Sequence, residues 1–366
     1  MASYEETTTV TTVTKLTAAV ALLVFVAGCA VTPSREDLEQ PAIMLSVIGT
    51  PPVTDMRAPF RTLFCAVLSQ RDPDQSADGC DEFLWRLPDE KTGAAQPRAP
   101  GPLDPRLSIL IVGGAFSDCF PPQSTAFVQS VAELRARGVY VDYAAVSGRS
   151  SSEANSKTIA EHIAAAPRTP GHPLILIGHS KGTADILEAL ATHDEAAARV
   201  SAVISFAGAV NGSPLAGRYL GLYSHYLSER AIGQCPTGDG GVLDSLTRAE
   251  RLNWFADNHL PPNIRYYSLG AFTTPPRLAR ALGYPQRHLS KIDTRNDGLL
   301  LIGDQLIPGS ELLGYANADH WAIAMRMEDR FPYLAHRSVG PYHYPQEALF
   351  EAALLFVQDE LGLSGH

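Results

Sequence analysis

One serine of the chain lies in a motif that could make its hydroxyl a nucleophile. The segment Gly178-His-Ser-Lys-Gly182 is the only G-x-S-x-G of the sequence, and it separates an apolar run at 173–177 from a helical pattern at 181–192. A sharp strand-to-helix turn tolerates little side-chain bulk beside the serine, which accounts for the two glycines. The oxygen of Ser180 would lie at a helix N-terminus, where backbone amides favour a developing negative charge. The motif therefore predicts a nucleophilic serine, and the alternative is an ordinary turn that contains one.

A serine hydroxyl is a weak nucleophile until a base takes its proton, and histidine is a common base for this purpose. Of the 11 histidines, His320 has the expected position, near the end of the chain and before the last helical pattern. His343 is the alternative. The others, His179 among them, are interpreted as surface or structural histidines.

The base in turn needs an acid that holds its ring. In the order expected for this motif the acid lies between the serine and the histidine, after a late strand. Asp297, in Arg295-Asn-Asp-Gly298, fits this position and would orient His320 and stabilise its imidazolium form. Because an Asp-Gly pair is usually only a turn, the assignment depends on order and spacing, and three further aspartates are alternatives: Asp293, Asp304 and Asp319.

The order Ser180, Asp297, His320 resembles that of the α/β-hydrolases. The stretch 296–320 is similar to bacterial lipases and related esterases, in which an Asn-Asp-Gly aspartate precedes the histidine by about this interval, and the likeness covers roughly residues 107–361. It implies an α/β-hydrolase fold and cleavage of small or lipid carboxylic esters through an acyl-enzyme on Ser180. Those lipases often bind calcium through an aspartate two residues after the histidine. Here that residue is Ala322, so we expect neither that metal site nor a cofactor.

Two backbone amides should hold the oxyanion of a tetrahedral intermediate. The amide of Lys181, directly after the nucleophile, is the first candidate. The second is expected in Gly113-Gly-Ala-Phe116, where related lipases have His-Gly-X, so that Ala115 would donate, or Phe116 if the register differs by one. We interpret the Lys181 side chain as a solvated residue of the first helical turn that pairs with a carboxylate, and contact with an acidic part of the substrate is the alternative.

These residues need a scaffold that brings distant segments together. After residue 106, apolar strands alternate with helical patterns, which predicts an α/β fold with a mostly parallel sheet and helices on both of its faces. We expect strands at 107–112, 139–146, 173–177, 200–206, 264–269 and within 297–307, and helices at 124–137, 150–166, 181–192 and 346–361. A capping box at Ser150 to Glu153 would begin the second helix.

The residues before this domain of 106–366 are harder to interpret. Residues 29–105 are expected to form an N-terminal extension with the first strands: a strand at 43–48, a helix or strand at 60–68 and a loop at 88–105. No internal repeat is visible.

An insertion of about fifty residues, at 211–262, interrupts the strand–helix alternation. We expect it to form a cap over the carboxyl edge of the sheet, where ligands bind in open α/β folds. Tyr219 and Tyr223, with Tyr226 at helical spacing, could line an acyl pocket with Phe116 and the pair Trp254-Phe255. The alternative, that these aromatic residues pack the cap onto the sheet domain, is equally open.

The N-terminus has the pattern of an export signal. An apolar run of 13 residues at 16–28 is too short to span a membrane stably but has the length of a secretory core region. Val26-Ala-Gly-Cys29 resembles a bacterial lipobox, which implies that residues 1–28 are removed and that Cys29 carries lipid. Ala30 then points to an exported lipoprotein anchored in the outer membrane. An ordinary cleaved signal and a membrane anchor are the alternatives.

Export changes how the other four cysteines are interpreted. Disulfides persist in oxidising compartments, and four cysteines allow three pairings. We favour Cys65 with Cys80, which closes a short loop, and Cys119 with Cys235, which would tie the insertion to the rim of the site. The alternative is four buried thiols.

The charge balance limits the partners of the chain. It has 29 lysines and arginines against 39 aspartates and glutamates, a formal charge of −10, whereas binding to nucleic acid needs clustered cations. We therefore expect no nucleic acid as a partner. The resemblance implies an ester substrate, and the lipobox-like segment implies contact with a membrane through the N-terminal lipid. Two other functions stay open: a surface lipoprotein that uses the scaffold only for binding, and an acyltransferase or thioesterase of the same fold.

Overall fold

A computed structural model describes residues 30–41, 44, 46–73, 77–90, 100–119, 125–167, 171–230, 235–326 and 343–363. The predicted signal segment 1–28 and the predicted lipidation site Cys29 lie outside these residues. No helix in the described ranges is long and apolar enough to cross a membrane.

The centre of the molecule is a sheet of seven parallel strands in the order β1-β7-β6-β5-β4-β2-β3. Its inner strands are almost fully buried, because helices cover both faces, and they consist of apolar runs without polar alternation. The predicted α/β fold with a parallel sheet is confirmed. The strands are β1 (Thr54–Asp55), β2 (Ser108–Val112), β3 (Tyr140–Tyr143), β4 (Leu174–His179), β5 (Val200–Phe206), β6 (Arg265–Ala271) and β7 (Glu311–Ala316).

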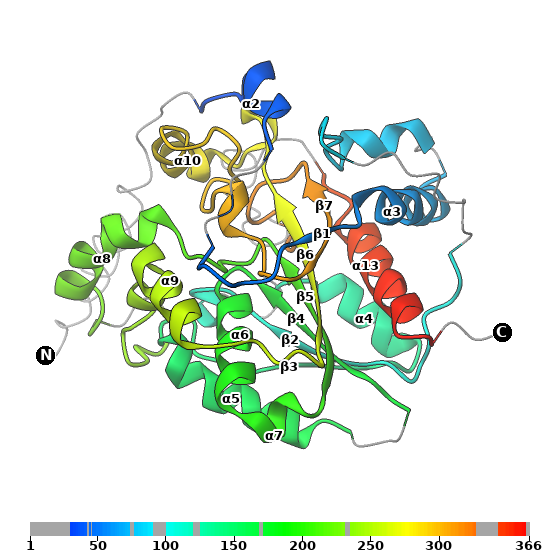
Figure 1. Ribbon diagram of the computed structural model, residues 1–366, viewed down its shortest axis with the longest axis horizontal. Helices are drawn as coiled ribbons and strands as arrows, with labels where there is room; N and C mark the ends of the chain where they lie inside the picture. The colour runs from blue at the N-terminus through cyan, green and yellow to red at the C-terminus, as the bar shows by residue number, and fades with distance from the viewer. Residues whose placement is uncertain are drawn as a thin grey trace, which may run out of the picture.

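Each face of the sheet has its own helices and its own apolar core (Figure 1). One face carries α3 (Arg57–Arg71), α4 (Val128–Ala136) and α13 (Gln346–Glu360), and the other carries α5 (Ser152–Ala165), α6 (Lys181–Thr192) and α7 (Asp194–Ala197). The helical alternative at 60–68 is thus correct. Because α3 packs against α13 and β7, and β1 pairs with β7, the N-terminal part joins the sheet domain.

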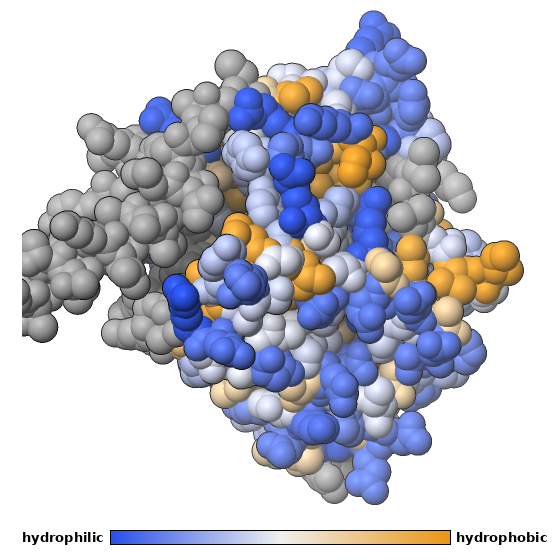
Figure 2. All heavy atoms as spheres, turned by 90° about the vertical axis from the view of Figure 1, so that its left-hand side faces the viewer, coloured by the Kyte–Doolittle hydropathy of each residue, from blue (hydrophilic) through white to orange (hydrophobic). Residues whose placement is uncertain are grey.

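Further segments lie beyond the carboxyl edge of the sheet. The insertion contains α8 (Pro214–Tyr226), η4 (Asp244–Leu246) and α9 (Arg248–Asp257), and a second excursion after β6 contains η5 (Pro275–Arg277), η6 (Arg280–Leu282) and α10 (Gly283–Leu289). The helix α10 lies against α8 (Figure 1). On the face that carries these two helices, hydrophilic residues predominate, and apolar residues form small groups among the hydrophilic ones (Figure 2). The remaining short helices are α2 (Arg35–Glu39), η1 (Ala77–Glu82), η2 (Ser117–Cys119) and η7 (Ile302–Asp304).

Three sequence expectations need correction. The last strand is β7 and not a strand within 297–307, because the chain there bends around the Asp297 carboxylate and then forms η7. The helix α5 begins one residue later than the predicted capping box, with Ser151 accepting from the Ala154 amide. No strand forms at 44 or 46–48, the described part of the segment 43–48.

Both favoured disulfides are present. Cys65 in α3 is bonded to Cys80 in η1, and Cys119 at the end of η2 is bonded to Cys235 in the insertion. The second bond closes a loop of 116 residues and joins the cap to the loop that follows β2.

Candidate active site

Ser180 occupies a strained turn between β4 and α6. Its φ is 57° and its ψ is −128°, a region that non-glycine residues rarely adopt and that often marks a functional position. The flanking glycines permit the turn: a Cβ on Gly178 would lie 2.7 Å from the Cα of Thr183, and one on Gly182 would lie 2.2 Å from the carbonyl oxygen of Val112. The two glycines therefore allow helix α6 to approach β2 and β4 as closely as this turn requires.

The loop after β2 lies directly against this serine. A Cβ on Gly114 would be 2.8 Å from the Cβ of Ser180 and 3.3 Å from its Oγ, so only glycine fits there. The Phe116 amide donates to the carbonyl of Gly148 at 2.8 Å and is therefore occupied. In the described part of the chain, by contrast, the amides of Ala115 and Lys181 donate to no carbonyl. The structure thus favours Ala115 over Phe116 as the second oxyanion donor.

A chain of hydrogen bonds joins the three residues expected to carry the chemistry. His320 Nε2 lies 2.8 Å from Ser180 Oγ, and His320 Nδ1 lies 2.7 Å from Asp297 Oδ2. The aspartate and the histidine are buried, and the serine is half-buried. They follow three different strands, β4, β6 and β7, whose carboxyl ends meet at one edge of the parallel sheet.

A tight turn holds the Asp297 carboxylate. Its Oδ1 accepts from the amides of Leu299 and Leu300 at 2.8 and 2.7 Å, which leaves Oδ2 for His320. The next residue, Gly298, has φ 96°, and a Cβ there would come within 2.8 Å of Leu282. The Asp-Gly pair therefore forms a turn and at the same time aims the acid at the histidine.

Two residues hold His320 from behind: His179, which was interpreted as a surface or structural histidine, and Asp319, which was an alternative for the acid and instead accepts from backbone amides. His179 is buried, and its Nε2 lies 2.9 Å from the backbone carbonyl of His320. Asp319 accepts from the amides of Trp321, Ala322 and Ala279 at 2.7–2.9 Å. Burial raises the pKa of the Asp319 carboxyl, and the three amides oppose this rise. The only sign in the sequence that His179 and Asp319 belong to the site is that they directly precede Ser180 and His320.

The Lys181 side chain corrects both interpretations made from the sequence. It is fully buried, so it is neither solvated nor able to meet an acidic substrate. Its Nζ pairs with Asp185 Oδ1 at 2.5 Å, and Asp185 Oδ2 accepts from Asn155 at 2.7 Å. Burial lowers the pKa of the Lys181 ammonium, and the Asp185 charge opposes this. The predicted carboxylate partner is therefore correct, but it lies inside the protein.

The remaining alternatives do not reach the serine. His343 is exposed on the approach to α13. Asp293 pairs with Arg295 at 2.9 Å, and Asp304 pairs with Arg248 of α9 at 2.6 Å. Burial raises the pKa of Asp304 to about 6 in spite of that arginine.

Aromatic residues of the cap lie behind the oxyanion loop or away from it. Tyr223 is buried and packs edge-to-face on Phe116, with ring centroids 6.0 Å apart. Tyr219 packs between α8 and α10, and the pair Trp254-Phe255 belongs to the core on the α6 face. Direct contact of Tyr219 and Tyr223 with a substrate stays a prediction. Ala115, Phe116 and Leu299 are half-buried apolar residues in the loops next to Ser180 and Asp297.

A buried arginine fixes this cap to the sheet domain. Arg149, fully buried, donates to the Tyr223 hydroxyl and to the carbonyls of Leu227, Ser228 and Arg230 at the end of α8. These contacts hold the turn that follows α8, from its C-cap residue Leu227 to Arg230, against the sheet domain. This role could not be predicted from the sequence, because the partners lie about 80 residues away and most of them are backbone atoms.

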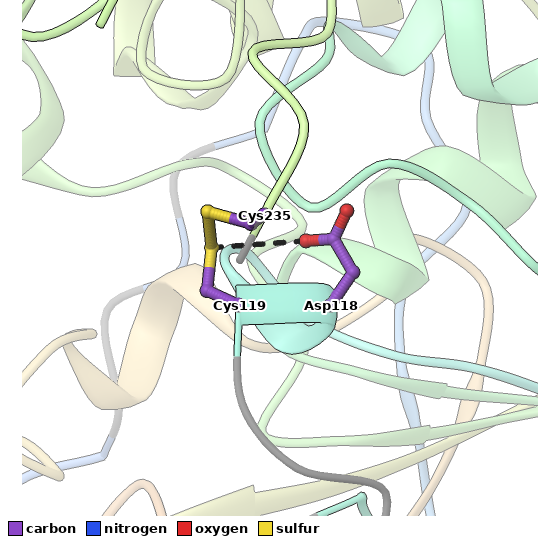
Figure 3. A group of neighbouring side chains, drawn as sticks. All are labelled: Asp118, Cys119 and Cys235. Atoms are coloured by element: carbon purple, nitrogen blue, oxygen red, sulfur yellow. Dashed lines mark hydrogen bonds between the residues drawn. A yellow bond between two sulfur atoms is a disulfide. The ribbon is translucent and has the colours of Figure 1, made fainter. Parts of the chain in front are cut away.

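The disulfide at the rim places a carboxylate beside two sulfurs. Asp118 Oδ1 lies 3.8 Å from the Sγ of Cys119, and Cys235 completes the group (Figure 3). Metal binding by cysteine requires a thiolate, and both sulfurs here are in the disulfide. The three side chains are thus neighbours because of the covalent bond between the cap and η2.

Comparison with known structures gives a strong similarity to a carboxyl esterase. A metagenomic carboxyl esterase, MGS0156, is 33% identical, and the match covers 89% of this chain and 98% of that chain with a TM-score of 0.78. More distant similarities include the mature lipase BlEst2 of Bacillus licheniformis (20% identity, 65% and 91% coverage, TM-score 0.49) and a lipase of Staphylococcus hyicus (13%, 72% and 96%, 0.47). The sequence matches no protein-family model and no curated protein sequence at a significant level.

Proposed function

This chain belongs to the α/β-hydrolase family of carboxyl esterases and lipases, and from that premise we propose that it is a serine esterase that works through an acyl-enzyme on Ser180. The observation that carries the proposal is the continuous hydrogen-bond chain from Ser180 Oγ through the His320 ring to Asp297. A hydroxyl held 2.8 Å from an imidazole nitrogen can transfer its proton as it attacks.

In the first half of the reaction, Ser180 Oγ adds to the ester carbonyl carbon and its proton moves to His320 Nε2. The carbonyl oxygen becomes an oxyanion, which the amides of Lys181 and Ala115 would bind. Asp297, bonded to Nδ1, stabilises the imidazolium and fixes the ring. Collapse of the intermediate breaks the ester C–O bond, and the imidazolium gives its proton to the departing alcohol.

In the second half, water attacks the acyl carbon while His320 takes a proton from it. The second oxyanion then collapses, the bond to Ser180 Oγ breaks, and the histidine returns the proton to the serine. No group outside these side chains and amides is needed. The half-buried apolar residues Ala115, Phe116 and Leu299 favour an apolar acyl group on the substrate.

The test uses p-nitrophenyl esters of graded acyl length. We expect Ser180→Ala and His320→Ala to lower kcat/KM by about 10⁴-fold or more, since either change removes the proton transfer. His343→Ala is the matched control and should keep full activity. A fluorophosphonate probe should label the natural protein but not Ser180→Ala, which separates an enzyme from a binding protein that merely has this scaffold. Unchanged rates in both triad variants would contradict the proposal.

We also propose that the protein is exported and anchored by lipid at Cys29, as the lipobox-like segment indicates. Mass spectrometry of the N-terminal peptide tests this directly. A diacylated residue 29 is expected, and an unmodified chain that keeps residues 1–28 would contradict it.

A further inference from the structure

The surface made by α8 and the segment 275–292 is positively charged on an acidic protein. In 214–227 and 275–292 there are five lysines and arginines and no aspartate or glutamate, although the whole chain has 39 acids against 29 bases. One of the five, Arg277, pairs with Glu82. In the described part of the chain no carboxylate pairs with the other four, which are Arg218, Arg280, Arg287 and Lys291.

Three of these four cations lie near one side chain, and Arg280 lies in η6, directly before α10. Partial burial, followed by the charges of Arg218, Lys291 and Arg287, lowers the pKa of His288 in α10. The guanidinium groups of Arg218 and Arg287 lie over the rings of Tyr219 and Tyr284, each 5.9 Å from the ring centroid. The helices themselves are joined through Leu215, Tyr219 and Leu289. The charges therefore belong to one continuous face.

Two carboxylates close to the segment 275–292 already have partners within the chain. Asp293 is bonded to Arg295, and Asp37 of α2 accepts from the backbone and hydroxyl of Ser34. We call the surface made by α8 and the segment 275–292 the α8–α10 face. These two carboxylates do not neutralise its four cations, which can therefore pair with anionic groups of a partner outside the molecule.

Large apolar side chains are exposed on the same face. Leu222 and Tyr226 of α8 are 45% and 52% exposed, and Ile292, in the turn that follows α10, is 59% exposed. In the view of this face, apolar groups lie directly beside strongly hydrophilic ones (Figure 2). Cations mixed with exposed apolar side chains are the composition of surfaces that bind at a lipid headgroup boundary.

The N-terminus reaches the molecule at this face. Gln286 of α10 makes two hydrogen bonds with Val31, donating to its carbonyl at 2.6 Å and accepting from its amide at 2.9 Å. Ala30 packs against the apolar group formed by Leu278, Ala279 and Leu282. The apolar run 16–28 thus ends two residues before Ala30, and Val31, the residue after Ala30, is bonded to Gln286 of α10.

We propose that the α8–α10 face, with Arg218, Arg280, Arg287, Lys291, Leu222 and Ile292, docks on the surface of an anionic phospholipid membrane. Anionic headgroups would pair with the four cations, and the apolar side chains would enter the boundary of the acyl chains. Leu299 and Trp321, which flank Asp297 and His320, pack on the same apolar group as Ala30. Docking would thus turn the side of the molecule next to the triad loops towards the lipid.

The test measures how much an anionic lipid strengthens vesicle binding of the full chain. Sedimentation is compared for phosphatidylcholine vesicles with and without 30% phosphatidylglycerol. The N-terminal anchor, which is the apolar run 16–28 in the full chain or the lipid on Cys29 in the mature protein, contributes to both and cancels in the ratio. Four cations at about fivefold each predict a ratio of roughly several hundredfold for the natural chain, and this ratio should fall as salt rises. Each cation near such a surface contributes about fivefold, so Arg280→Gln/Lys291→Gln should lower the ratio by roughly 20- to 30-fold or abolish it.

The control variant removes the same charge elsewhere. Arg137→Gln/Lys157→Gln changes exposed cations on α4 and α5 and should leave the ratio unchanged. A melting temperature equal to that of the natural chain shows that each variant is folded, so the test does not depend on esterase activity. Hydrogen exchange of α8 and of residues 290–292 should slow when anionic vesicles are present. A natural chain with a ratio near one, or an equal loss in the control, would overturn the proposal.

Discussion

The carboxyl edge of the sheet and the cap above it are held in place by different means. At the sheet edge, backbones approach so closely that Gly114, Gly178 and Gly182 cannot carry a Cβ, and the triad follows from this packing. In the cap, α8 depends on single long-range ties, above all Arg149 and the bond between Cys119 and Cys235. The edge fixes the position of the reacting groups, and the cap has freedom to change. The following predictions test this difference.

The largest effect is expected from Gly114→Ala. The added methyl would lie 2.8 Å from the Cβ of Ser180, so the loop must move away and take the Ala115 amide with it. Because loss of one oxyanion donor costs about 10²–10³-fold in kcat, we expect a decrease of that size with little change in melting temperature. Steady-state kinetics on a soluble ester measures it. A variant with natural kcat would show that this loop does not hold the donor.

A loss of stability is expected from Arg149→Met, with the fold of the sheet domain retained. The change removes the donor of three part-buried carbonyls in the turn after α8, which should lower the free energy of unfolding by about 1–3 kcal/mol. Denaturant titration measures it. Arg218→Met, on the exposed side of the same helix, is the control and should change stability by less than about 0.5 kcal/mol. An equal decrease in the free energy of unfolding of the two variants would contradict a specific role of Arg149 in holding the cap.

The tie between α9 and η7 should depend on pH. Burial raises the pKa of Asp304 to about 6 from an ordinary value of 3.8, so its contribution to stability is complete below about pH 4 and is lost as pH rises through 6. Asp304→Asn has no such loss. Between pH 4 and 7 the stability of the natural chain relative to this variant should therefore fall by up to about 3 kcal/mol, at about 1.4 kcal/mol per pKa unit. Parallel stability curves would contradict the raised pKa.

The smallest effect is expected from Gly217→Ala in α8. A Cβ there meets nothing within 4 Å, and alanine favours a helix over glycine by about 0.5–1 kcal/mol. We expect a small gain in stability and unchanged kcat, measured beside Gly114→Ala. The same substitution would thus abolish most activity at the sheet edge and be harmless in the cap.

The same difference explains what could be predicted from the sequence. Ser180 was predicted from a local pattern, the glycine turn between a strand run and a helical pattern. Asp297 and His320 were predicted from their order along the chain and from the resemblance to bacterial lipases, and the structure brings the three side chains together. The positions of Arg149 and Lys181 were not predictable in this way. Their partners lie in loops or one helical turn further on, and only the folded packing shows that both side chains are fully buried. The strand β7 was missed for a related reason, since a glycine interrupts its apolar pattern.

The position of the cap in the connectivity has a consequence for the length that the cap can have. The insertion lies in the crossover between β5 and β6, which are neighbours in the sheet, whereas the acid and the base follow β6 and β7. When a crossover between adjacent strands is lengthened, the entropic cost of closing the loop rises only with the logarithm of the loop length. A cap of another length could therefore replace this one at a small entropic cost, while the strands that precede Ser180, Asp297 and His320 stay as they are.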